Sequence, residues 1–381
     1  MMPDSPVQAA CRPVPAHGRQ RLVKRRGLLR VRERSERRKG RAMKNPDNHT
    51  RARRRRAASA LLGTLATVLA VSGTPGALAQ PSAPYPVKPI RMVVPFAAGG
   101  SNDVIARLIG PRMTEAFGQT VVVDNRPGAG SVIGSEIVAR AAGDGYTLLL
   151  ADSALGFALA VQGRQVYDAV KDFTPITLIG NAPMMLLVPT PLPVQSLKDY
   201  LALARQQGGK LTVGSGGLGG VAHLSSELVQ LRAGIRLTHI AYKGAGPAVA
   251  DLVGGHIQSA FLTLASAMPQ VKAGKLRVVG ITGDRRMAVL PDVPTFAEQG
   301  LKGMDLEQWW GLLGPASVAQ PIVDRLHAET VKALGVADIR ERVSELGVIA
   351  NPQPGPVFRR LIEREVSGAE RLVKEAGIKV E

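Results

Sequence analysis

From Tyr85 onward, short apolar runs alternate with longer segments whose apolar residues lie three or four positions apart. Short continuous apolar runs are typical of strands buried on both faces, and the wider spacing is typical of amphipathic helices. The alternation predicts an α/β protein in which helices flank mostly parallel sheets. The predicted strands are 90–94, 121–123, 146–150, 184–188, 211–213, 237–240, 257–261 and 276–281. The predicted helices among them are 103–117, a segment around Ile133, Ile137 and Val138, one that begins at Ser196, and 221–231.

The last 60 or so residues have helical spacing only, so an all-helical end is predicted, with helices at 322–334, 339–346 and 357–373. The Ser196-x-x-Asp199 sequence predicts a capping box at the start of its helix. The α/β body of about 302 residues is too long for one typical domain. Two lobes are therefore expected.

The residues ahead of Gln80 have the pattern of an export signal. From Met43 a cationic stretch at 51–56 is followed by an uncharged apolar run at 57–71 and by the small-x-small sequence Ala77-Leu78-Ala79. This order is typical of a secretory signal peptide, so translation is expected to start at Met43 and cleavage to follow Ala79. The general secretory route is favoured, and a twin-arginine route stays open because of the arginines. The apolar run is shorter than a membrane span needs, which predicts a soluble periplasmic protein.

The excess positive charge also lies in this leader. Of the net charge of +19, residues 1–79 contribute 19 Lys+Arg against 4 Asp+Glu, and the remainder 30 against 26. A basic arm for nucleic acid would have to be retained beside an apolar run and a cleavage site, so no nucleic-acid partner is expected. The single cysteine, Cys11, is in the leader, which leaves the mature chain without a disulfide or a thiolate metal site.

Three glycine-rich turns follow predicted strands, at 95–103, 125–130 and 214–220. In open parallel sheets, ligands bind where strands end and helices begin, and small residues let an anion reach the backbone N–H groups there. One such turn is more often a plain connection, but three at equivalent strand ends indicate a binding site. The candidate ligand-binding residues in these turns are Phe96, Ala97, Ala98, Gly99, Gly100, Asn102, Asp103, Gly128, Ala129, Gly130, Ser215, Gly216, Gly217, Gly219 and Gly220.

Other chemistries have less support. The third turn matches G-x-G-x-x-G from Gly214, but no carboxylate stands at the end of the next strand to hold a ribose. The sequence has no Gly-x-Ser-x-Gly around Ser215, and the histidines of the body lack metal-ligand spacing. We therefore expect no catalytic residue, no metal and no cofactor. Trp309-Trp310 is interpreted as packing, with a ligand platform as the alternative.

These turns, in this order, resemble the extracytoplasmic solute-binding proteins of the tripartite tricarboxylate transporter family, the Bug proteins. The resemblance covers roughly residues 85–379. The matching motifs are Tyr85-Pro86-Val87-Lys88-Pro89-Ile90, Val94-Pro95-Phe96 with Gly99, Gly100 and Asp103, Asn125-Arg126-Pro127-Gly128-Ala129-Gly130, Asp144-Gly145-Tyr146-Thr147-Leu148, Val170-Lys171-Asp172-Phe173, Ala241-Tyr242-Lys243-Gly244, Pro291-Asp292-Val293-Pro294-Thr295 and Pro321-Ile322-Val323-Asp324-Arg325-Leu326.

The resemblance implies a two-lobed periplasmic binding protein of the Venus flytrap type, with lobes at 84–184 plus 305–381 and at 185–304. It implies a monomer that holds a small carboxylate through backbone N–H groups and ordered water, and that delivers it to membrane permease subunits. The first turn would act from one lobe, and the third turn with His223 from the other. Tyr242, Lys243 and Ser153 complete the candidate ligand-binding residues.

Two positions depart from the family pattern. Gly220 stands where a hydroxyl residue is frequent, and Leu262 stands where an acidic residue is frequent. Losing these polar groups favours a ligand that is bulkier or less polar than a small amino dicarboxylate, such as an aromatic acid. The alternatives are a ligand-sensing accessory of a membrane signalling system and an exported hydrolase.

Overall fold

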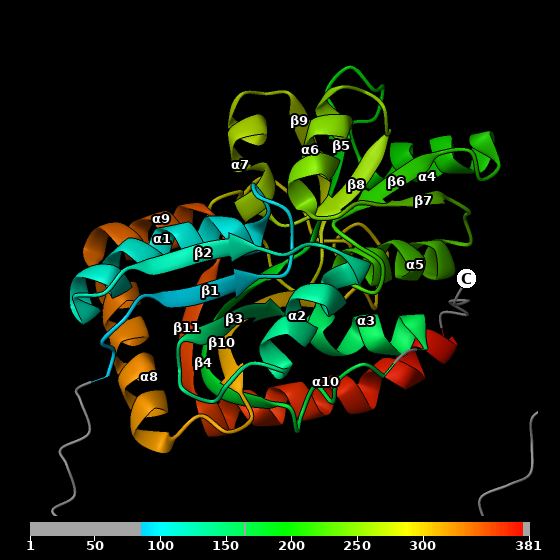
Figure 1. Ribbon diagram of the computed structural model, residues 1–381. Coiled ribbons are helices and arrows are strands. Elements are labelled where there is room, and N and C mark those ends of the chain that lie inside the picture. Colours follow the sequence, from blue (N-terminus) through cyan, green and yellow to red (C-terminus); the bar gives the residue numbers. More distant parts are fainter. Residues whose placement is uncertain (1–84, 164, 376–381) are drawn as a thin grey trace, which may run out of the picture. The chain divides into compact units, whose positions relative to one another are not determined.

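The computed structural model describes residues 85–163 and 165–375, which form two β-sheets flanked by helices (Figure 1). The predicted start at Met43, the signal peptide, its cleavage site and Cys11 lie outside the described residues. Within the described ranges, no helix has both the length and the apolar character needed to cross a membrane.

The first sheet, sheet A, has six strands in the order β11-β4-β10-β3-β1-β2. Strand β1 pairs in parallel with β2 and β3, whereas β10 runs antiparallel to β3 and β4, and β4 antiparallel to β11. The strands are β1 (Ile90–Val94), β2 (Val121–Asn125), β3 (Thr147–Asp152), β4 (Phe173–Pro183), β10 (Glu307–Pro315) and β11 (Ile349–Pro354).

The second sheet, sheet B, has five strands in the order β7-β6-β8-β5-β9. Strand β6 pairs in parallel with β7 and β8, and β5 runs antiparallel to β8 and β9. The strands are β5 (Met185–Pro189), β6 (Thr212–Ser215), β7 (Thr238–Ala241), β8 (Ser259–Leu262) and β9 (Leu276–Ile281).

Helices cover both faces of sheet A, as the continuous apolar strands require. On one face Ile105 of α1 and Leu326 of α8 belong to one buried cluster with Met92 of β1, and on the other Leu155 of α3 and Phe358 of α10 belong to a second buried cluster. In Figure 1, α1, α8 and α9 lie on one side and α2, α3 and α10 on the other. These helices are α1 (Ser101–Phe117), α2 (Val132–Ala139), α3 (Ala154–Gln162), α8 (Gln320–Gly335), α9 (Ala337–Glu345) and α10 (Gly355–Glu375), with a short 3₁₀ turn, η1 (Ala129–Ser131), ahead of α2.

Sheet B is covered in the same way. Tyr200 of α4 and Val229 of α5 pack with Phe261 in one buried cluster, and Leu252 of α6 and Leu264 of α7 pack with Leu187 in another. The helices are α4 (Leu197–Gln207), α5 (Val221–Ala233), α6 (Ala245–Val253) and α7 (Leu264–Lys272).

The predicted α/β class is confirmed, but both sheets are mixed and not mostly parallel. The chain leaves sheet A at the end of β4 and returns as β10, and these crossing strands have to run antiparallel to their neighbours. The expected all-helical end is also wrong, because β11 lies between α9 and α10. This strand contains Pro352 and Pro354 and no alternation of apolar residues, which a strand at the edge of a sheet tolerates.

The two crossings between the sheets are hydrogen-bonded to each other. The Met184 N–H donates to Thr282 Oγ1 at 2.8 Å, the Thr282 N–H donates to the Met184 carbonyl at 2.9 Å, and the Thr282 hydroxyl donates to the Leu306 carbonyl at 2.7 Å. The two chain segments that connect the sheets are therefore tied together at Met184 and Thr282. The division into lobes at 84–184 plus 305–381 and at 185–304, as units that move, stays a prediction.

Candidate functional site

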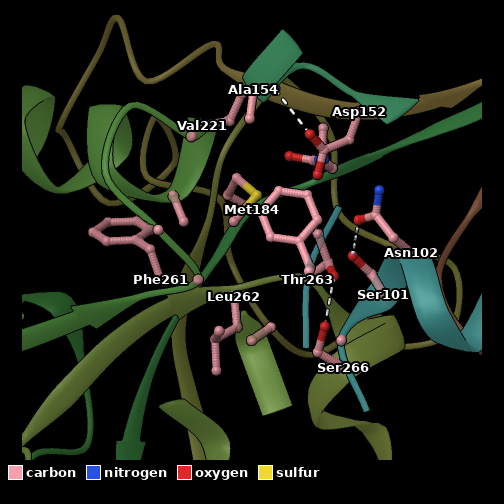
Figure 2. A pocket seen from close by; sticks show the side chains of 18 of the residues that line it. Ser101, Asn102, Asp152, Ala154, Met184, Val221, Phe261, Leu262, Thr263 and Ser266 are labelled. Atoms are coloured by element: carbon pink, nitrogen blue, oxygen red, sulfur yellow. Dashed lines mark hydrogen bonds between the residues drawn. The ribbon is translucent and has the colours of Figure 1, made fainter. Parts of the chain in front are cut away.

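A pocket lies between the two sheets, and residues from both line it (Figure 2). Its empty volume is about 520 Å³, which includes space open to solvent. The lining residues are Phe96, Gly100, Ser101, Asn102, Gly130, Asp152, Ala154, Met184, Gly216, Gly217, Gly220, Val221, Ala222, Ala245, Phe261, Leu262, Thr263, Ser266 and Gln308.

Five helices begin at this pocket. Their N-cap residues make no side-chain hydrogen bond to the first helical turn. At α3 the Asp152 carboxylate accepts the Ala154 N–H instead, and at the other four helices no N-cap side chain satisfies the initial N–H groups. The N-caps are Gly100 of α1, Ser153 of α3, Gly220 of α5, Gly244 of α6 and Thr263 of α7. Free N–H groups and the positive ends of the helix dipoles favour an anion here.

None of the described lining residues is Lys, Arg or His, so no cationic side chain among them attracts an anion. Side chains from β8, α5 and the crossing at Met184 give the pocket an apolar wall, which includes Met184, Val221, Phe261 and Leu262. Gly220 and Leu262, the two positions that depart from the family pattern, both line the pocket. The apolar wall thus includes a position, Leu262, at which the sequence predicted fewer polar groups to hold the ligand.

The polar lining side chains come mainly from sheet A and α1. The Asn102 amide donates to the Leu150 carbonyl at 3.2 Å, and the Trp310 indole N–H donates to Ser101 Oγ at 3.3 Å. Trp310 is fully buried, and Trp309 packs edge-to-face on Phe358 with ring centroids 5.0 Å apart. Both tryptophans therefore serve as packing residues, as predicted, and neither lines the pocket.

Among the described residues that line the pocket, Asp152 is the one with an ionisable side chain. It ends β3, is 6% exposed, and accepts a hydrogen bond from the Ala154 N–H at 2.9 Å. Burial raises the pKa of its carboxyl to about 7, although hydrogen bonds from the Ala154 backbone and from the Gln308 and Asn102 side chains oppose that shift.

The turns from the two sheets touch around the pocket, which gives a closed arrangement. The Ala97 N–H donates to the Lys243 carbonyl at 2.9 Å. Gly130 has a φ of 59°, and a Cβ at this position would overlap the carbonyl oxygen of Leu218. Only glycine allows this left-handed backbone to approach the opposite turn so closely.

Charged side chains support the first turn. The Asp103 carboxylate accepts the Gly99 N–H at 3.0 Å and two bonds from Arg107 at 3.0 Å, and the Asn125 amide donates to the Phe96 carbonyl at 3.0 Å. Burial acts to raise the pKa of the Asp103 carboxyl, but the hydrogen bonds from Arg107 and Gly99 lower it overall.

Two stacked histidines support the third turn. The His223 and His239 rings lie 4.2 Å apart, the Gly219 N–H donates to His223 Nδ1 at 3.2 Å, and His239 Nε2 lies 2.8 Å from Ser215 Oγ. The Ser215 hydroxyl in turn donates to the Gly217 carbonyl at 3.1 Å. Burial lowers the pKa of His223 to about 4; burial and the charge of His223 lower that of His239 to about 3. Both are neutral near pH 7.

The predicted site residues fall into three groups. Phe96, Gly100, Asn102, Gly130, Gly216, Gly217 and Gly220 line the pocket. Gly128, Ala129, Tyr242 and Lys243 line a neighbouring hollow that shares Phe96, Gly130 and Gly216. Ala97, Ala98, Gly99, Asp103, Ser153, Ser215, Gly219 and His223 line neither. A binding role stays a prediction for every one of them.

Sequence reasoning missed several lining residues, among them Asp152, Met184 and Gln308. Asp152 ends a predicted strand, so the rule that ligands bind at the carboxyl ends of strands could have found it. Met184 lies at a crossing between the sheets and Gln308 in the unpredicted strand β10, and no local pattern places either at a pocket.

The fold and pocket define a two-sheet binding protein whose ligand site lies between the sheets. Residues 105–378 match the model of the tripartite tricarboxylate transporter family receptor. The chain is 36% identical to the UPF0065 protein in the tcbD-tcbE intergenic region of Pseudomonas sp. strain P51, over 87% of this chain and 97% of that one. It is 35% identical to BugT of Bordetella pertussis, over 84% and 98% respectively. The chain belongs to this receptor family, which confirms the resemblance.

Solved structures agree. Periplasmic binding protein BugD superposes with a TM-score of 0.75 at 32% identity, covering 77% of this chain and 99% of that one. MatC of Rhodopseudomonas palustris with bound malate superposes with a TM-score of 0.72 at 33% identity, covering 76% and 100%. The two-lobed periplasmic binding protein fold is therefore confirmed.

Proposed function

We propose that the mature chain captures a small carboxylate in the pocket and presents the closed form to permease subunits of a tripartite tricarboxylate transporter. The observation that carries this proposal is the meeting of four helix N-termini without a side-chain partner, those of α1, α5, α6 and α7, at a pocket in which no described lining residue is cationic. Binding by relatives supports it, since one related structure contains malate and another adipate.

A carboxylate fits this pocket for a physical reason. Its two oxygens accept several hydrogen bonds in a plane, and N–H groups at the starts of α1 and α5 come from opposite sheets. A ligand bound by both starts stabilises the closed arrangement in which Ala97 and Lys243 are hydrogen-bonded. The ligand is returned unchanged, and the permease would distinguish the closed form from the open one.

The leader fits this function. We propose export by the general secretory route with cleavage after Ala79, which places the pocket in the periplasm. The mass of the N-terminal peptide of the protein from a periplasmic extract tests this. A peptide that begins at Gln80 is expected, and one that contains residues before Met43 would contradict both the start and the cleavage site.

Ligand binding is tested by a thermal-shift screen of the purified protein against mono-, di- and tricarboxylates, aromatic acids and amino acids. A carboxylate at 100 times its dissociation constant is expected to add about 2.7 kcal/mol to the free energy of unfolding. The ligand is then recovered and is expected to be chemically unchanged. Silence across all carboxylates from a folded protein would refute the proposal.

A matched pair of variants ties binding to the pocket. Ala222 and Ala233 are both partly buried in the same cluster, at opposite ends of α5, and only Ala222 lines the pocket. Ala222→Asp puts a carboxylate where the ligand's is proposed to bind, so binding is expected to fall at least a hundredfold. Ala233→Asp is expected to lower stability, because it places a negative charge at the helix C-terminus, and to leave binding intact.

A further inference from the structure

Asp152 makes one of the five helix starts different from the others. Its carboxylate accepts the Ala154 N–H, so the protein itself supplies the anion at the start of α3. The N-caps of α1, α5, α6 and α7 leave their first turns without any side-chain partner. An anionic ligand can therefore accept hydrogen bonds from the N-termini of four of these helices. At the N-terminus of the fifth helix, α3, the Asp152 carboxylate is already in place.

The surroundings of Asp152 keep this carboxyl in place. The Ala154 N–H donates to it at 2.9 Å, and Asn102 of α1 and Gln308 of β10 line the same pocket. The carboxyl faces Met184 and Phe261 of the opposite wall (Figure 2). Within residues 85–163 and 165–375, no cationic side chain lines the pocket to neutralise it. A ligand group beside Asp152 therefore meets a buried hydrogen-bond acceptor, and a second ligand carboxylate there would face a like charge at low dielectric.

We propose that Asp152 is the specificity-determining residue, and that the ligand carries one carboxylate, an apolar body and a hydrogen-bond donor, a hydroxyl or an ammonium group, that meets Asp152. Ligands with a carboxylate at both ends are disfavoured. This inference rests on the proposed function, in which the helix starts bind the ligand's carboxylate. It adds which chemical group the opposite end of that ligand carries. The apolar body fits the wall formed by Met184, Phe261 and Leu262.

The pH dependence of binding separates the two ligand types. Burial raises the pKa of Asp152 to about 7, so the carboxyl gains a proton as the pH falls below that value and can then donate to a ligand carboxylate. Dicarboxylate binding is expected to weaken as the pH rises through 7, and binding of an ammonium ligand to strengthen. Besides burial, the charge of Asp152 acts on two titratable groups nearby, Glu365 of α10 and Tyr167, and raises the pKa of both. Burial raises the pKa of Glu365 to about 8, and Tyr167 stays neutral because burial raises its pKa further.

The test uses three matched ligand sets, built on succinate, adipate and terephthalate. Each set contains the dicarboxylate and the acids in which one carboxylate is replaced by a hydroxymethyl or an aminomethyl group. Affinities are measured by calorimetry at pH 6 and pH 8 for the wild type, for Asp152→Asn and for two controls. Asp168→Asn alters a carboxylate that accepts backbone N–H groups but lies outside the pocket. Glu365→Gln removes the second titrating carboxyl.

In at least one set, the hydroxymethyl or aminomethyl acid is expected to bind the wild type at least tenfold tighter than the dicarboxylate at pH 8. Asp152→Asn is expected to reduce that ratio at least tenfold, while Asp168→Asn and Glu365→Gln retain it. The hydroxymethyl and aminomethyl arms show which donor is preferred. If Asp152→Asn does not fold, the affinities of the wild type and of Glu365→Gln are compared at the two pH values. A pH dependence of the ratio that persists in Glu365→Gln is then the result expected for Asp152.

Dicarboxylates that bind tightest at pH 8, with a ratio unaffected by Asp152→Asn or by pH, would overturn the assignment of Asp152 and leave the proposed function standing. Absence of binding by every carboxylate at either pH would instead overturn the proposed function. The two failures are thus distinguishable.

Discussion

The first and third glycine-rich turns face the same pocket, but different side chains support them. Asp103 and Arg107 support the first turn with charges, and the Arg107 side chain is 56% exposed. His223 and His239 support the third turn as neutral rings that burial keeps unprotonated. Both supports accept a hydrogen bond from a glycine N–H, of Gly99 in one turn and of Gly219 in the other.

The difference shows that a glycine-rich turn can be held in place either by an ion pair or by neutral buried rings. The charged support tolerates acid, because hydrogen bonds keep the pKa of the buried Asp103 low, but salt screens its ion pair with the exposed Arg107. The stability that a buried neutral support contributes does not depend on salt, but it is lost when a histidine ring takes up a proton. Three changes test this contrast.

The largest effect is expected from the two left-handed glycines. Gly99 and Gly219 have φ values of 81° and 78°, but a Cβ at Gly219 would lie 2.6 Å from the Ala158 Cα, whereas at Gly99 its nearest neighbour is 3.7 Å away. Gly99→Ala is expected to cost about 1–2 kcal/mol of backbone strain. Gly219→Ala adds steric overlap, for a total of up to about 5 kcal/mol.

Urea unfolding of both variants measures these costs. Equal losses of stability would mean that the third turn yields as easily as the first, and that its packing against α3 does not constrain it.

The second effect is a loss of stability in acid that comes from the histidine pair. The folded-state pKa of His223 is about 4, below its usual 6.5, so the unfolded chain takes up the proton first and stability is lost as the pH falls through this range. The loss is up to about 3 kcal/mol for this residue. Asp152 and Glu365, whose pKa values are raised, contribute with the opposite sign, so the comparison must be between variants.

The matched variant is His223→Asn with His239→Gln, since these side chains offer polar atoms near the ring nitrogens and do not titrate. Relative to the wild type, the double variant is expected to lose less stability between pH 6.5 and pH 4. Parallel pH profiles would show that the pair is not protonated in this range.

The smallest effect is expected at the charged support. Asp103→Asn keeps an oxygen for the Gly99 N–H but removes the ion pair with Arg107, which is expected to cost about 1 kcal/mol or less. The cost should shrink in high salt, where the wild type loses the same contribution. Glu136→Gln, which breaks the exposed pair with Arg140 on α2, is the control. A cost for Asp103→Asn that is unchanged by salt would contradict the charge-based support.

Elements with a clear local pattern were predicted from the sequence. Strand β1 has the predicted bounds, and α4 begins with the predicted capping box between Ser196 and Asp199. Strand β10 was missed because it begins with Glu307 and Gln308 and then becomes a continuous apolar run with two glycines and two tryptophans, so no period marks it. Helices α6 and α7 were missed because each is short, rich in small residues and contains a proline.

The pocket was predicted only in part for a related reason. Turns rich in glycine are visible locally, and Gly100, Gly130 and Gly216 do line the pocket. Gln308 reaches it because β10 inserts between β3 and β4, a pairing over more than a hundred residues of sequence. Which strands become neighbours is set by packing of the whole body, and no local pattern records it.

The linked crossings at Met184 and Thr282 have a mechanical consequence. Rotation of one sheet against the other has to pass through them, and Met184 also lines the pocket. A ligand bound in this pocket, as proposed, would lie beside the pivot of the predicted movement of the lobes, where a small displacement becomes a larger one in the parts of each lobe far from the pivot. A permease that contacts those distant parts of the lobes would respond to the ligand through their relative position, without touching the ligand.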